Sequence, residues 1–143
     1  MKKKKTIIIR NPDAIRPWQH VIDVLSGYLL LAQKLYEDEN KYSGGWNFGP
    51  NQDDGKTVKW ITQFMVKKWK KNINWRLDRR NNPHEAEYLK LDISKAKKIL
   101  GWKPVWSLEK SLLKVLDWHD HWLNRDDIEK ICKKQILEHL NEK

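Results

Sequence analysis

A short segment near the start of the sequence, residues 15–23 (Ile-Arg-Pro-Trp-Gln-His-Val-Ile-Asp), constrains the fold more than any other feature. Pro17 disfavours helical backbone at Arg16, so this segment should lead in an extended conformation into the helix that follows. Little precedes it beyond Met1, four lysines and the apolar run at residues 7–9. A βαβ unit takes about 30 residues. We therefore expect no Rossmann-type, dinucleotide-binding half ahead of this segment.

The length and composition suit one domain over residues 1–143. Hydrophobic residues make up 39% of the chain and include nine Trp, enough for a buried core. No apolar run approaches the ~20 residues of a membrane span, and residues 7–9 are too short for a signal peptide. Cys132 is the only cysteine, which excludes a disulfide framework and favours the cytoplasm.

Apolar spacing and capping residues predict an α+β, mostly helical fold with about five helices and short strands. We expect helices after Asp23, Thr57, Asp92, Ser107 and Asp127, each of which can cap a helix. Gly101 should end the third of these helices. Strands are expected at residues 7–9, 42–48 and 73–77.

Two groups of side chains could bind an anionic or hydroxyl-bearing ligand. Arg16 could clamp a pyrophosphate, although an ion pair with Asp23 is an equally good interpretation. The loop containing Asn81, Asn82, His84 and Glu85 offers amides, an imidazole and a carboxylate that suit sugar hydroxyls and a phosphate, or it is a plain polar turn.

Other reactive residues suit a structural role better. His119 and His121 lie two positions apart on a predicted helix and so point to different sides, which argues against a shared metal ion. His119 and Cys132 fall on apolar stripes, where core packing is the better interpretation. The net charge of +10 could attract nucleic acid, but lysines at helix-surface spacing are more simply solvated faces, so we do not expect nucleic-acid binding.

The sequence lacks the groups that would hold a nicotinamide cofactor. It contains no Gly-x-Gly-x-x-Gly or Gly-x-x-Gly-x-x-Gly run, and none of its four tyrosines is followed four positions later by lysine. We therefore expect this chain to bind no NAD, to hold no metal and to contribute no catalytic residues.

Three segments in this order and spacing resemble the C-terminal substrate-binding part of extended short-chain dehydrogenase/reductases that act on sugar nucleotides. They are residues 16–28, residues 46–50 (Trp-Asn-Phe-Gly-Pro) and residues 92–104, with Asp-Ile-Ser-Lys-Ala before Leu-Gly-Trp-Lys-Pro. Residues 8–12 and 83–92 are most similar to the CDP-glucose 4,6-dehydratases. The resemblance runs from Ile7 to about Trp122.

This resemblance implies a cytoplasmic lyase with bound NAD that converts CDP-glucose to CDP-4-keto-6-deoxyglucose and water, for the dideoxysugars of surface polysaccharide. It implies that Arg16 binds phosphate and that His84 and Glu85 belong to a loop closing over the nucleotide. Many relatives carry an arginine where Asn81 and Asn82 stand. The Tyr–Lys pair, the acid/base carboxylates and the NAD loop would all map upstream of Met1.

Two functional hypotheses follow. In the first, the chain is the sugar-nucleotide-binding part of such a dehydratase, inactive alone, binding CDP-glucose weakly and self-associating through the apolar face of its first helix. In the second, it is a free-standing basic module for nucleic acid or another anionic partner, and residues 67–71, Arg76, Arg79 and Arg80 would then form one basic face.

Overall fold

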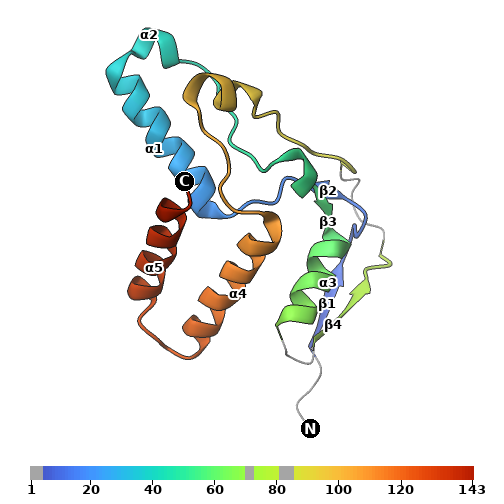
Figure 1. The fold of residues 1–143 in the computed structure, drawn as a ribbon. Coiled ribbons are helices and arrows are strands. Elements are labelled where there is room, and N and C mark those ends of the chain that lie inside the picture. Colours follow the sequence, from blue (N-terminus) through green and yellow to red (C-terminus); the bar gives the residue numbers. More distant parts are fainter. Residues whose placement is uncertain (1–4, 70–72, 81–85) are drawn as a thin grey trace.

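The computed structural model describes residues 5–69, 73–80 and 86–143 and confirms an α+β, mostly helical fold (Figure 1). The strands are β1 (Lys5–Ile9), β2 (Ile15–Arg16), β3 (Lys56–Thr57) and β4 (Ile73–Leu77). The α-helices are α1 (Val21–Glu37), α2 (Glu39–Tyr42), α3 (Val58–Lys68), α4 (Leu108–Leu123) and α5 (Ile128–Asn141). A 3₁₀ turn, η1, covers Gln52–Asp54, and a π-helical turn, η2, covers Ala96–Leu100. None of the described helices is long and apolar enough to cross a bilayer.

Two small sheets organise the amino-terminal half. β1 pairs in parallel with β4, with Ile8 opposite Arg76 and Ile9 opposite Leu77. The backbone N–H of Asp78 donates to the carbonyl of Ile9 at 2.7 Å, so the hydrogen bonding continues one residue past β4. β2 pairs antiparallel with β3, and this pair lies at the start of α3. Both longer strands were expected from the sequence, whereas their pairing comes from the fold.

The main buried cluster lies under α1. It consists of Tyr42, Phe48, Ile93, Ala96, Leu100 and Trp102, against which Val24, Leu30, Leu31 and Leu35 pack. Gly27 permits a close approach here, because a Cβ at this position would lie 2.3 Å from the Phe48 ring. Of the apolar face that the sequence predicted for α1, Val24, Leu31 and Leu35 pack on this cluster, whereas Leu25, Tyr28 and Ala32 are exposed.

The local signals at helix ends are confirmed at Thr57, Ser107 and Asp127, whose side chains accept backbone N–H groups of α3, α4 and α5. Asp92 accepts the N–H of Ser94 at 2.8 Å, just before the η2 turn. Gly101, at φ 67°, ends that turn, as expected for a left-handed residue.

Two expectations for residues near α1 were wrong. Asp23 does not cap the helix: His20 does, and Asp23 lies fully buried in the first turn. Residues 42–48 form no strand, because Tyr42 ends α2 and the chain then runs on without a ladder partner among the described residues. Its aromatic side chains pack into the α1 cluster instead.

The apolar stripes of α4 and α5 are buried only in part. Leu108, Leu112 and Leu116 are core residues, but Val115 and Trp122 are 43% and 52% exposed. In α5 the deeply buried residues are Gln135 and His139, whereas Ile136 and Leu140, expected inside, are exposed. The two helices pack on each other as a hairpin (Figure 1), and Val115 and Ile136 line an open apolar hollow shared with the start of α1.

Candidate sugar-nucleotide site

The segment that carries Arg16 is held by its backbone and by its neighbours' side chains. Arg16 lies in β2, is half-buried, and donates from Nη1 to the carbonyl of Ile15 at 2.9 Å. Trp18 Nε1 donates to the Lys56 carbonyl at 2.9 Å, and Gln19 Nε2 donates to the Gly49 carbonyl at 3.3 Å. These bonds tie the segment to β3 and to the 46–50 motif, so the backbone around Arg16 is fixed before any ligand binds.

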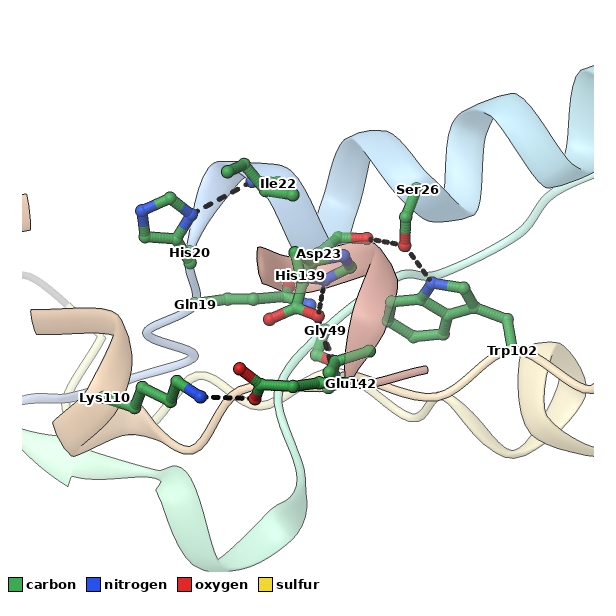
Figure 2. Close-up of polar contacts among 11 residues, drawn as sticks. Gln19, His20, Ile22, Asp23, Ser26, Gly49, Trp102, Lys110, His139 and Glu142 are labelled. Atoms are coloured by element: carbon green, nitrogen blue, oxygen red, sulfur yellow. Dashed lines mark hydrogen bonds and ion pairs between the residues drawn. The ribbon is translucent and has the colours of Figure 1, made fainter. Parts of the chain in front are cut away.

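A buried polar cluster then joins the end of this segment to the C-terminus of the chain (Figure 2). Asp23 Oδ1 accepts from the Val105 N–H at 2.7 Å and from His139 Nε2 at 2.8 Å. Asp23 and His139 are 0% and 1% exposed. Asp23 is therefore not the ion-pair partner suggested for Arg16, since its carboxylate bonds to His139 of α5 and to the backbone of Val105.

His20 sits at the junction of the segment and this cluster. Its Nδ1 accepts the Ile22 N–H at 3.2 Å, and its ring packs edge-on against Trp106, which in turn packs edge-on against His139. Burial lowers the pKa of His20, because an imidazolium would lose its hydration there; the Asp23 carboxylate offsets this in part. His20 is thus held as the neutral imidazole that can accept the capping hydrogen bond.

The connection after β4 returns to the side of β2. Ile15 N–H donates to the Glu87 carbonyl at 2.8 Å, and Leu89 N–H donates to the Ile15 carbonyl at 3.2 Å. The strand that bears Arg16 therefore lies between β3 and residues 87–89. Asn81, Asn82, His84 and Glu85, the remaining expected site residues, lie outside the described residues.

An arginine-lined hollow of about 730 Å³, called here the arginine hollow, lies at the carboxyl end of the parallel β1–β4 pair. Its lining residues are Ile8, Arg76, Leu77, Asp78, Arg79 and Arg80. Ligands of open sheets with parallel strands gather at the carboxyl ends of the strands. The 78–89 connection thus begins at a cationic hollow and ends beside Arg16.

The sequence pointed to this hollow only in part. Arg76, Arg79 and Arg80 were selected as members of a basic face, but Ile8 was not, since only the pairing of β1 with β4 places it beside them. The available signal was the pair of arginines that follows β4 after Asp78. Among the described residues, no cluster of three His, Cys, Asp or Glu side chains could hold a metal ion.

Of the basic residues in the second hypothesis, Lys70 and Lys71 lie outside the described residues, and the others divide between two places. Lys67 and Lys68 line a separate hollow on α3 with Trp60, Gln63, Phe64 and, from α4, Glu109. Trp60 and Phe64 stack with ring centroids 5.3 Å apart. Among the described residues, this hollow shares no lining residue with the arginine hollow.

His119 is half-buried between Trp69 and Trp122, and Cys132 accepts the indole N–H of Trp118 at 3.3 Å.

Comparison with known proteins places this geometry in a family context. A sequence model described as GDP-mannose 4,6 dehydratase matches residues 1–115. The chain is 46% identical over 140 residues to the CDP-glucose 4,6-dehydratase of Salmonella typhimurium, covering 98% of this chain and 39% of that protein. It is 29% identical over 109 residues to a UDP-glucose 4-epimerase of Pisum sativum, covering 76% of this chain and 30% of the epimerase. The chain thus spans less than half the length of these relatives.

Proposed function

Because this chain belongs to the GDP-mannose 4,6-dehydratase family, we propose that it is the sugar-nucleotide-binding part of a CDP-glucose 4,6-dehydratase. The observation that carries the proposal is the placement of Arg16 on a fixed strand beside the returning 87–89 segment. The 46% identity to a CDP-glucose 4,6-dehydratase supports CDP-glucose as the nucleotide sugar.

In this proposal the chain binds and orients the substrate, and the redox chemistry belongs to the rest of a longer enzyme. That enzyme would oxidise C4 of the glucosyl unit, eliminate water across C5 and C6, and return the hydride to C6. NAD supplies the hydride acceptor when it is bound. The described residues do not fit NAD, because β1 leads to β2 and β4 leads to the 78–89 connection, so neither strand enters a glycine-rich helix start.

Arg16 and the arginine hollow would divide the binding of the diphosphate. A guanidinium can donate two parallel hydrogen bonds to one phosphate, and such charge-assisted bonds contribute about 1.5–3 kcal/mol each. Because Asn81 and Asn82 cannot supply the charge of an arginine, Arg79 and Arg80 become the candidate second phosphate contact. Association itself costs at least about 4 kcal/mol, so we expect this chain alone to bind CDP-glucose weakly.

The runner-up proposal, a free-standing nucleic-acid module, rests on one observation. The stacked Trp60 and Phe64 lie under Lys56 and Lys68, an arrangement of aromatic faces and cations of the kind used for unpaired bases. Among the described residues, Lys67 and Lys68 line one hollow and the three arginines line another, which weakens this proposal, since a strand of nucleic acid needs a continuous positive track.

The test is an NMR titration of the ¹⁵N-labelled chain with CDP-glucose, CDP and a short oligouridylate. We expect weak binding of both nucleotides, lost in Arg16→Ala and retained in Arg125→Asn. Arg125 lies in the α4–α5 turn at φ 61°, a conformation that asparagine tolerates, so it is a matched arginine control.

Two results would contradict the proposal. Binding of CDP-glucose that does not depend on Arg16 would place the site elsewhere, and tight binding of the oligouridylate with no response to CDP would favour the runner-up. As a second measurement, the purified chain with CDP-glucose and NAD should yield no 4-keto product above background.

A further inference from the structure

We infer that Asp78 is a positioning residue that holds the guanidinium of Arg80 at the rim of the arginine hollow, ready for the diphosphate of a nucleotide ligand. This inference rests on the proposed function and adds to it a residue whose negative charge would not by itself suggest a role in binding an anion.

The geometry of the pair is specific. Arg80 Nε lies 2.9 Å from Asp78 Oδ1 and 3.1 Å from Oδ2, and Arg80 Nη2 lies 2.7 Å from Oδ2. The backbone N–H of Arg80 also donates to Asp78 Oδ1 at 3.1 Å. One carboxylate therefore fixes both ends of Arg80, its backbone and its guanidinium, in the side-on arrangement that restricts rotation most strongly.

The two partners differ sharply in exposure. The Asp78 side chain is 5% exposed, whereas that of Arg80 is 80% exposed. The backbone N–H of Asp78 continues the β1–β4 hydrogen bonding through Ile9, so the carboxylate stands on the sheet itself. An arginine so exposed would otherwise sample many rotamers, and each binding event would have to order it at an entropic cost. Asp78 has already ordered it.

The competing interpretation is plain charge neutralisation. Asp78 would then only cancel the charge of Arg80 and repel an incoming phosphate. The two interpretations predict opposite effects of Asp78→Asn on anion affinity. This variant makes the chain one unit more positive. Neutralisation predicts tighter anion binding in this variant, whereas positioning predicts weaker binding, because an amide loses the charge that holds the guanidinium.

The experiment titrates four forms of the full 143-residue chain with CDP and with inorganic pyrophosphate: wild type, Asp78→Asn, Arg80→Ala and the double variant. We expect Asp78→Asn to bind CDP at least about fivefold more weakly, and Arg80→Ala to lose a similar amount. The double variant should be no weaker than Arg80→Ala, because Asp78 acts through Arg80. Arg80→Lys keeps the positive charge but loses the planar set of guanidinium donors, so this variant should also bind CDP weakly.

Controls separate this role from folding and from general charge. Glu129→Gln, on the exposed surface of α5, makes the same charge change away from the hollow (Figure 1) and should leave affinity unchanged or slightly higher. The melting temperature of each variant is measured beside its affinity, and a fall in affinity at unchanged melting temperature supports positioning.

The outcomes are distinct. If Asp78→Asn binds CDP as tightly as wild type or more tightly, while Arg16→Ala still abolishes binding, the inference is overturned and the proposed function stands. If the wild-type chain binds neither CDP nor pyrophosphate, both are overturned. Weaker binding in Asp78→Asn with additive loss in the double variant would also overturn the inference, since Asp78 would then act independently of Arg80.

Discussion

Replacing Asp23 by alanine should destabilise this domain far more than an ordinary substitution in the first turn of a helix. The carboxylate accepts two buried hydrogen bonds through Oδ1, from Val105 N–H at 2.7 Å and from His139 Nε2 at 2.8 Å. Without it, both donors are buried and unpaired, at about 1–3 kcal/mol each. Removing one partner of such a buried, hydrogen-bonded pair leaves the other uncompensated, so we expect a loss of about 3–5 kcal/mol.

The physical reason can be tested with three more variants. His139→Ala should cost a similar amount, because it leaves the Asp23 carboxylate buried with one hydrogen-bond partner. Asp23→Asn should cost less, since an amide oxygen can still accept from both donors. Its NH₂ group would then replace Oδ2, which has no hydrogen-bond partner among the described residues. Asp23→Leu combined with His139→Phe removes both partners and should be less destabilising than the sum of the two single changes.

The measurement is urea unfolding followed by tryptophan fluorescence, to which Trp106, packed against His139, contributes as one of nine tryptophans. A loss of about 3–5 kcal/mol is a large share of the roughly 5–15 kcal/mol that stabilises a typical domain. Asp23→Ala is therefore best studied at low temperature. If Asp23→Ala lowers the free energy of unfolding by less than about 1 kcal/mol, Asp23 and His139 do not form a buried pair. The same conclusion follows if the effects of changing both residues simply add.

Three further predictions concern other parts of the fold. Burial lowers the pKa of His20 below its unfolded value of about 6.5, so the stability that His20 contributes is present above that pH and is lost as the pH falls. The urea concentration at the unfolding midpoint should therefore decline from about pH 7 to pH 5, and should decline less in His20→Asn. Gly27→Ala should lower the free energy of unfolding by about 1–3 kcal/mol despite alanine's better helix propensity, since the new Cβ would lie 2.3 Å from the Phe48 ring. Gly45→Ala, whose Cβ would meet nothing within 4 Å, should be nearly neutral in the same urea assay. We propose that the chain self-associates through the exposed apolar residues at the start of α1, where Leu25 is 49% exposed. Light scattering should show a concentration-dependent mass that falls to the monomer in Leu25→Glu. A monomeric mass for the wild-type chain at high concentration would refute this.

The sequence by itself determined the local structure and the chemistry of single residues. Thr57, Ser107 and Asp127 cap helices because a cap needs only a side chain and an N–H group three residues later. Gly101 ends its turn for an equally local reason, its left-handed backbone. Arg16 could be selected as an anion ligand because a guanidinium keeps its charge and fork geometry in any fold.

Only the tertiary structure decided what these elements meet. Asp23 looked like a cap within its own turn, but its partner His139 lies 116 positions away, and no local pattern encodes that distance. The arginine hollow exists because β1 pairs in parallel with β4, which brings Ile8 beside Arg76. The aromatic 42–48 segment packs under α1 instead of forming a strand, because burying Tyr42 and Phe48 against the core removes more apolar surface from water than an unpartnered strand could. Local hydrogen bonds are fixed by sequence neighbours, whereas burial depends on the whole path of the chain.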